Sequence, residues 1–166
     1  PLAAQPDRHP DDDDQADKYE FVDEQLIAAG LANYEVSNWA VPGHESRHNF
    51  LYWRQQNYRG FGCAAHSHAD GRRWWNIRTP DRYIDAVNAG VSVEASSETL
   101  DVNQRRSEGQ QLTLRTRDGV ERSAFDEATL ELVGDMVVEH PTEPERVVLT
   151  RSGRLMANDI SVRLRD

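Results

Sequence analysis

Hydrophobic and polar positions follow two different periods near the start of the chain. Apolar residues recur at helical spacing over residues 16–29, and Gly30 stands where a C-terminal cap belongs, so this stretch predicts a helix. Apolar and polar residues alternate over residues 31–37, which predicts a strand. A helix, a glycine and a strand in this order indicate an α/β unit. The apolar side of the expected helix consists of Tyr19, Val22, Leu26 and Ala29.

The pattern is weaker in the middle of the chain. Asp70 and Gly71 predict a turn, and residues 80–88 predict a short helix that starts at a proline and stops at Gly90. The composition then changes to small and acidic residues over 91–99, where we place a domain boundary. The expected regions are an acidic loop or irregular terminus over 1–15, one domain over 16–95 and a second over 96–166.

The second domain combines helices with a short hairpin. Ser123 with Asp126 resembles a capping box, which would start a helix there. The order of elements is compatible with a winged-helix-like module, and the whole chain reads as a mixture of helix and sheet, α/β or α+β. The expected elements are helices over 102–115 and 123–138, a strand over 147–149 and a last helix capped by Thr150.

Composition and charge narrow the classes of protein. A hydrophobic content of 37%, a charged content of 29% and a mean hydropathy of -0.79 are core-poor for this length and predict part of a longer protein. No apolar run approaches the roughly 20 residues that span a bilayer, and no secretory signal pattern opens the chain, so we expect a cytoplasmic protein without a transmembrane segment. The net charge of -10 argues against nucleic acid as the main partner.

Candidate chemistry concentrates in residues 34–77. This stretch holds four of the six histidines, all four tryptophans and the single Cys63, which we expect to be a small buried hydrophobe. His44 and His48 match the H-E-x-x-H pattern of zinc proteases. A proline and a glycine precede the motif, no apolar helical stripe surrounds it, and no third ligand is evident. The protease interpretation is therefore disfavoured.

The string that starts at His48 and ends at Trp53, HNFLYW, has two interpretations. Histidine can ligate heme iron, and flat aromatic side chains can pack on a porphyrin. In the structural alternative, Tyr52 and Trp53 are core anchors and His48 is a hydrogen-bonded polar residue. Residue chemistry by itself favours the structural alternative.

Small residues and two further histidines follow this string. Gly60, Gly62 and Ala64 would permit close approach of the backbone to a nucleotide-like ligand, although packing is the commoner reason for such residues. His66 and His68 on a strand would point to one face, as a metal-binding pair does. One such pair without a carboxylate or thiolate nearby is more often structural.

The order and spacing of these residues resemble the HemW family of radical S-adenosylmethionine (SAM) heme chaperones, which are related to oxygen-independent coproporphyrinogen III oxidase. The most specific part is His48-Asn49 followed by Tyr52-Trp53, which is characteristic of the heme-binding branch. The resemblance extends from about residue 16 onward. It is carried by residues 34–40, 42–43, 46–49, 52–53, 58, 60, 62, 65–67, 76, 83, 104–106, 114–120 and 149–158.

The resemblance implies a fold, a ligand and partners. Residues 16–95 would form the end of a partial (β/α) radical-SAM barrel of the TIM type, and residues 96–166 a winged-helix-like C-terminal domain. Heme and an unidentified heme-acceptor protein are the implied partners, and a homodimer is left open. The implied site residues are His48 as the ligand of heme iron, Asn49, Tyr52 and Trp53 as its neighbours, and Gly60, Gly62 and Ala64 beside the SAM cavity.

One departure from the family concerns cysteine. The family holds a 4Fe–4S cluster on three cysteines near its N-terminus, whereas this chain has only Cys63. We therefore expect a fragment that carries no cluster, and we assign no catalytic residue. Two alternatives to heme transfer are oxidation of coproporphyrinogen III, which the His48 element disfavours, and a winged-helix interaction module, whose binding to DNA the acidic charge disfavours.

Overall fold

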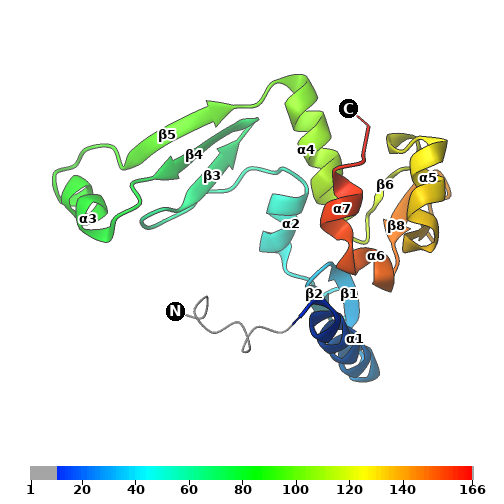
Figure 1. Ribbon diagram of the computed structural model, residues 1–166. Helices are drawn as coiled ribbons and strands as arrows, with labels where there is room; N and C mark the ends of the chain where they lie inside the picture. The colour runs from blue at the N-terminus through cyan, green and yellow to red at the C-terminus, as the bar shows by residue number, and fades with distance from the viewer. Residues whose placement is uncertain (1–10, 166) are drawn as a thin grey trace.

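The computed structural model describes residues 11–165, which form a body and an arm that projects from it (Figure 1). The arm is a three-stranded sheet with a helix at its far end, and a longer helix leads from the sheet back to the body. The elements are α1 (Asp12–Ala28), β1 (Ala32–Glu35), β2 (Asn38–Ala40), α2 (Arg47–Trp53), β3 (His66–Ala69), β4 (Arg72–Asn76), α3 (Pro80–Asn88), β5 (Glu94–Thr99), α4 (Val102–Leu114), β6 (Val120–Glu121), η3 (Arg122–Ala124), α5 (Glu127–Val133), η4 (Gly134–Met136), β7 (Val137–Glu139), β8 (Arg146–Leu149), α6 (Arg151–Leu155) and α7 (Ala157–Ser161).

The first helix and strand confirm the predicted pair but differ in detail. Helix α1 begins at Asp12 behind the N-cap Asp11, so residues 12–15, which were expected in a loop, form its first turn. Carboxylates are favourable there because the N-terminus of a helix carries partial positive charge. Residues 1–10 of the predicted acidic terminus lie outside the described residues.

The buried side of α1 is not the predicted apolar stripe. Val22 and Ala29 are exposed, Tyr19 and Leu26 are half-buried, and the buried residue of the helix is Asp23. A polar contact therefore replaces the expected hydrophobic one, and its partners come from β2 and α6.

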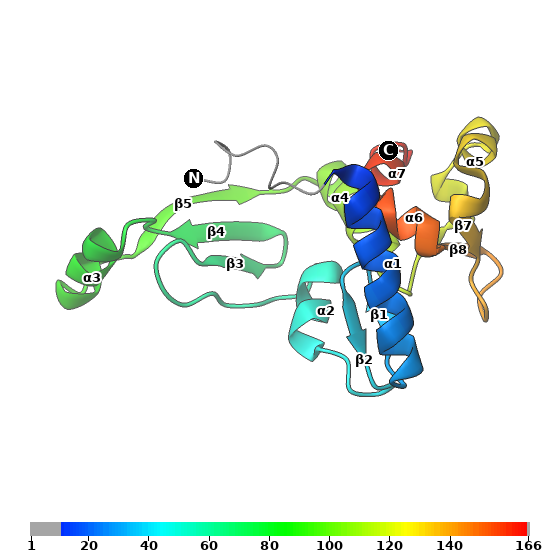
Figure 2. The ribbon, with the colours of Figure 1, turned by 60° about the horizontal axis from the view of Figure 1, so that its bottom comes forward.

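The arm is the antiparallel sheet β3-β4-β5 with α3 at its end (Figure 2). The turn between β3 and β4 is the predicted one. Asp70 and Gly71 have φ values of 50° and 87°, and positive φ at both residues lets a two-residue turn match the right-handed twist of the two strands. Helix α3 has the predicted bounds, with proline at its start. The stretch over residues 91–99, where the domain boundary is predicted, contains β5, which pairs with β4.

The hydrophobic core lies in the C-terminal part of the body, beneath the sheet β6-β8-β7 and the helices around it. The predicted helix over 123–138 is confirmed only in its middle part, because the α-helix there, α5, covers residues 127–133. Asp126 rather than Ser123 caps α5, which ends at Val133 with Gly134 as its C-cap, and residues 137–139 pair with β8 as a strand. The buried core residues are Leu114, Val120, Ala124, Phe125, Val133, Val147 and Ile160.

The mixture of helix and sheet confirms the coarse fold class. Within residues 11–165 all strand pairs are antiparallel, so the described residues do not themselves form the parallel sheet of a barrel. Strand β1 is nevertheless tied to the C-terminal part, because the backbone of Val36 donates to Arg115 and that of Arg117 donates to Tyr34. In the same range, no helix is both long and apolar enough to cross a membrane.

The predicted cap at Thr150 is confirmed and allows a stability test. Its hydroxyl oxygen accepts a hydrogen bond from the backbone of Gly153 at 3.1 Å. We expect Thr150→Ala to lower the free energy of unfolding by about 1 kcal/mol, because a backbone donor in the first turn loses its partner. Chemical denaturation measures this loss. Thr150→Ser keeps the hydroxyl and is expected to lose less; an equal loss in both variants would show that the methyl group, not the cap, stabilises α6.

Candidate functional site

The HNFLYW string lies on α2, a short helix whose N-cap is Ser46. Positions four apart in a helix share a face, so His48 and Tyr52 lie side by side on the outer surface and both are exposed. The Nε2 atom of His48 is 2.7 Å from the Tyr52 hydroxyl oxygen. The two rings meet edge to face, with centroids 4.9 Å apart. The predicted iron ligand is thus accessible and is held by one neighbour in its own helix.

Asn49 and Trp53 occupy a different side of α2, facing the body, and are half-buried. The amide of Asn49 donates to the Tyr34 hydroxyl at 3.3 Å, which links α2 to β1. The indole Nε1 of Trp53 is buried and has no hydrogen-bond partner within residues 11–165. Trp53 and the hydrogen-bonded His48 thus fit the structural alternative, whereas Tyr52, its other expected core anchor, is exposed. The ligand interpretation concerns the side of His48 and stays a prediction.

A row of aromatic rings continues inward from His48. Tyr52 packs edge to face on Tyr58, with centroids 4.4 Å apart, and Tyr58 forms an antiparallel bridge with His68. Burial raises the pKa of Tyr58, and the neighbouring Tyr52 adds to this increase. A cavity of about 170 Å³ opens beside these rings, between α2, α4 and the sheet of the arm. Because Tyr58 is backed by the sheet, it supports Tyr52 from behind.

Gly60, Gly62 and Ala64 lie in the loop before β3, away from α2. A Cβ atom at Gly60 would be 2.1 Å from the carbonyl oxygen of His66, so this glycine is required for packing within the chain. Gly62 donates its backbone N–H to the Tyr83 hydroxyl of α3. The structure therefore places this loop with α3, and it does not bring the loop together with His48.

Cys63 belongs to the same loop and is exposed, so the prediction of a buried cysteine is wrong. The loop lies beside the end of β4, where the side-chain amide of Asn76 donates to the carbonyl of Gly62 at 2.8 Å. Ala64 lines a cavity of about 460 Å³ on this side of the arm, together with His66, Trp75, Asn76, Arg78 and Ala95.

The remaining histidine motifs do not form one centre. His44 lies in the loop before α2, and Glu45 between the two histidines pairs with Arg117 at 2.7 Å. Backbone hydrogen bonds of Glu45 and Gly43, followed by the contact with Arg117, hold the pKa of the Glu45 carboxyl below its usual value. No group of three or more histidine, cysteine, aspartate or glutamate side chains in residues 11–165 is placed to hold a metal ion.

The two histidines of β3 have separate partners. The ring of His66 packs against Trp75, with centroids 5.8 Å apart, and His66 is exposed. His68 is buried, and its Nδ1 atom is 3.1 Å from the carbonyl oxygen of Gln56. These contacts are those of structural histidines, which favours the structural interpretation of this pair.

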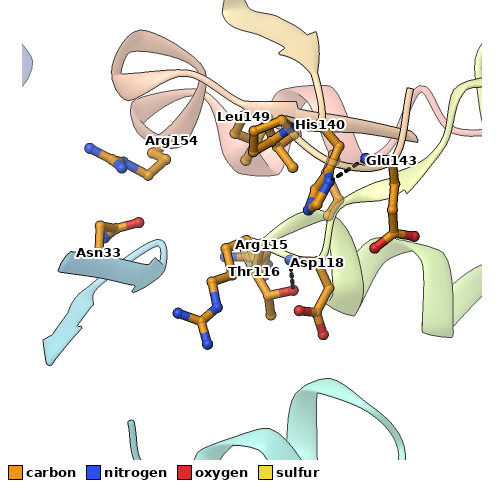
Figure 3. Close-up of a pocket in the computed structure, with 12 residues that line it drawn as sticks. Asn33, Arg115, Thr116, Asp118, His140, Glu143, Leu149 and Arg154 are labelled. Atoms are coloured by element: carbon orange, nitrogen blue, oxygen red, sulfur yellow. Dashed lines mark hydrogen bonds between the residues drawn. The ribbon is translucent and has the colours of Figure 1, made fainter. Parts of the chain in front are cut away.

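A cavity of about 470 Å³ lies between β1, the turn after α4 and the β7–β8 hairpin (Figure 3). Asn33, Arg115 and Arg154 line one side of it, and His140 and Glu143 line the other. Sequence analysis assigned no role to these side chains. The sequence pointed to Arg115 and Arg154 only in that they lie in the stretches 114–120 and 149–158, which carry part of the family resemblance.

Most charged groups around this cavity already have partners. Arg154 pairs with Asp23 at 3.0 Å, Arg117 with Glu45, and Asp118 with Arg54 at 2.7 Å. The guanidinium of Arg115 donates to the side-chain oxygen of Asn158, a neutral acceptor. The predicted site residues are not among the residues that line this cavity.

Comparison with known proteins gives matches over nearly the whole chain. The chain is 37% identical over 155 residues to the heme chaperone HemW of Mycobacterium tuberculosis (strain CDC 1551 / Oshkosh), covering 91% of this chain and 39% of that protein. It is 30% identical over 162 residues to the heme chaperone HemW of Bacillus subtilis (strain 168), covering 91% of this chain and 42% of that protein. The chain thus spans about two fifths of the length of the curated relatives it matches. No protein-family model matches it.

A solved structure shows the same fold. It is described as coproporphyrinogen III oxidase (HemN) from Escherichia coli, a radical SAM enzyme. The TM-score is 0.66 at 15% sequence identity, over 92% of this chain and 41% of that one. At this identity the likeness supports a shared fold over the matched part and carries no statement about activity.

Proposed function

The chain belongs to the HemW family, and from this membership we propose that the protein binds heme and transfers it to an acceptor protein. The observation that carries the proposal is the exposed imidazole of His48 on the outer face of α2, beside an aromatic side chain. An accessible imidazole is a common axial ligand of heme iron. The acceptor protein, a homodimer and a cytoplasmic location stay predictions.

The surface around His48 suits a flat ligand that lies on the protein. Tyr52 is 40% exposed, so part of its ring is available to a porphyrin. The neighbouring cavity of about 170 Å³ is smaller than the roughly 300–1,000 Å³ that ordinary ligand pockets enclose. We therefore place the heme against the outer face of α2 and not inside the protein. Open binding of this kind favours transfer, because an acceptor can reach the heme while it is still bound.

The family assignment also leads to proposals for SAM and for the division into domains. We propose the loop with Gly60, Gly62 and Ala64 as the side that faces SAM, and the cavity of about 460 Å³ lined by Ala64 supports this. We also propose that residues 16–95 extend a radical-SAM barrel and that residues 96–166 form a winged-helix-like domain. The unit α1–β1 and the sheet β6-β8-β7 with its helices support this division. The 4Fe–4S cluster is proposed only for family members that carry the cysteine motif.

Hemin titration tests the proposed ligand. We expect His48→Ala to weaken hemin binding by at least tenfold and to change the Soret band, because the axial nitrogen is lost. His44→Ala is the matched control, since His44 is also exposed, lies four positions earlier and precedes the helix. Absorbance titration of the wild-type protein and both variants measures the effect. Equal affinity and an unchanged Soret band in His48→Ala would contradict the assignment.

A further inference from the structure

One ring nitrogen of His48, Nε2, already has a hydrogen-bond partner in the same helix. Its Nε2 atom lies 2.7 Å from the Tyr52 hydroxyl oxygen, a normal hydrogen-bond distance. A neutral imidazole has one nitrogen that donates and one that accepts, and a hydroxyl can serve either. In both tautomers the hydroxyl oxygen therefore stands in front of Nε2.

Iron cannot reach Nε2 while this contact persists. A metal–imidazole bond is about 2 Å long and forms along the lone pair of the nitrogen. The Tyr52 oxygen occupies that direction at 2.7 Å, which leaves no room for a metal between the two atoms. Ligation through Nε2 therefore requires that the His48–Tyr52 hydrogen bond first breaks.

The position of Tyr52 is set by the body of the protein and not by His48 alone. Its ring packs edge to face on Tyr58, with centroids 4.4 Å apart and an interplanar angle of 67°. The backbone of Tyr58 is fixed by two hydrogen bonds with His68, of 2.9 and 3.0 Å. The arm thus supports the tyrosine that covers the histidine, and His48 on the open side is the group free to turn away.

From this geometry we propose that Tyr52 is a positioning residue that masks His48 Nε2 and competes with iron for it. The proposal rests on the proposed heme binding and adds a reason for reversibility. Each time heme leaves, the hydroxyl recaptures the imidazole, which lowers the affinity and favours transfer to an acceptor. A net hydrogen bond of ordinary strength corresponds to an effect of about fivefold on such an equilibrium.

Chemical modification in the absence of heme tests whether the Tyr52 hydroxyl covers Nε2 of His48. Diethyl pyrocarbonate acylates an imidazole nitrogen whose lone pair is free, so Tyr52→Phe is expected to raise the acylation rate of His48 about fivefold. Cleavage after arginine and lysine places His44 and His48 on separate peptides, because Arg47 lies between them. Mass spectrometry of the full chain therefore reads both rates at once, and His44 serves as the internal reference. An unchanged His48 rate in Tyr52→Phe would overturn the mask.

Hemin binding tests the consequence. Tyr52→Phe keeps the ring and removes the hydroxyl, so we expect hemin to bind about fivefold more tightly and to transfer more slowly to apomyoglobin. Tyr19→Phe is the matched control, because the hydroxyl of Tyr19 donates to the carbonyl of Val36 and not to His48. It is expected to bind hemin as the wild type does.

The outcomes separate this proposal from the proposed function. Unchanged hemin affinity in Tyr52→Phe, together with loss of binding in His48→Ala, would overturn the competition between Tyr52 and iron. Unchanged hemin binding in His48→Ala as well would instead refute the heme site. In that case the acylation rates still decide whether Tyr52 masks His48.

Discussion

Replacing Asp23 with alanine is expected to lower the free energy of unfolding by about 3–5 kcal/mol, because Arg154 would lose its carboxylate partner and Arg151 would keep only the exposed Glu24. The Asp23 carboxylate is 1% exposed. One oxygen accepts from Arg151 at 2.7 Å and from Arg154 at 3.0 Å, and the other accepts from the indole of Trp39 at 2.6 Å. This single side chain therefore joins α1 to β2 and α6.

The loss should be large because, among residues 11–165, no other carboxylate pairs with Arg154. Arg154 is only 15% exposed, and its Nε atom already lacks a partner among the described residues. Urea denaturation followed by circular dichroism measures the change. Glu24→Ala is the control, since Glu24 pairs with Arg151 from a side chain that is 60% exposed, and exposed pairs contribute little. Equal losses in both variants would show that the buried carboxylate has no special role.

Shortening Leu114 to alanine is the second large effect, with an expected loss of about 2–5 kcal/mol. Leu114 ends α4, is 0% exposed and belongs to the main hydrophobic cluster with Val120, Val147 and Ile160. The cost has two parts: the lost transfer of apolar surface from water, and the cavity that the rigid surroundings leave unfilled. We expect the variant to fold with a lower denaturation midpoint.

Leu132→Ala is the matched control for this prediction. The same side chain is removed from α5, where it is 64% exposed, so the expected change is within about 0.5 kcal/mol. Thermal and urea unfolding of both variants provide the measurement. A loss at Leu132 as large as that at Leu114 would mean that α5 packs against a surface beyond the cluster described above.

Both predictions concern the framework that holds α2. Strand β1 lies against the segment that follows Leu114, and Asn49 of α2 contacts Tyr34 of β1. Arg54 at the end of α2 pairs with Asp118 in the same segment. Variants that destabilise these contacts should therefore also change the position of α2 and of His48 on it. For this reason hemin affinity has to be compared among variants that remain folded.

Local signals in the sequence determined many of the elements. The Asp70-Gly71 turn, the proline-started α3 and the Thr150 cap all depend on the backbone preferences of adjacent residues, and each is confirmed. The spacing of His48 and Tyr52 likewise places both on one face once α2 forms, because helical geometry fixes positions four apart. The family resemblance, confirmed by the relatives, also came from sequence.

Tertiary contacts decided the rest, because they join residues far apart in the chain. The helix predicted over 123–138 ends at Val133 since residues 137–139 find hydrogen-bond partners in β8. Cys63 is exposed and Asp23 buried because the loop around Cys63 runs over the surface, whereas Arg151 and Arg154, 128 and 131 positions later, surround the carboxylate. The same holds at the proposed site: the sequence places Tyr52 beside His48, but only the packing of Tyr58 from the arm holds its ring there.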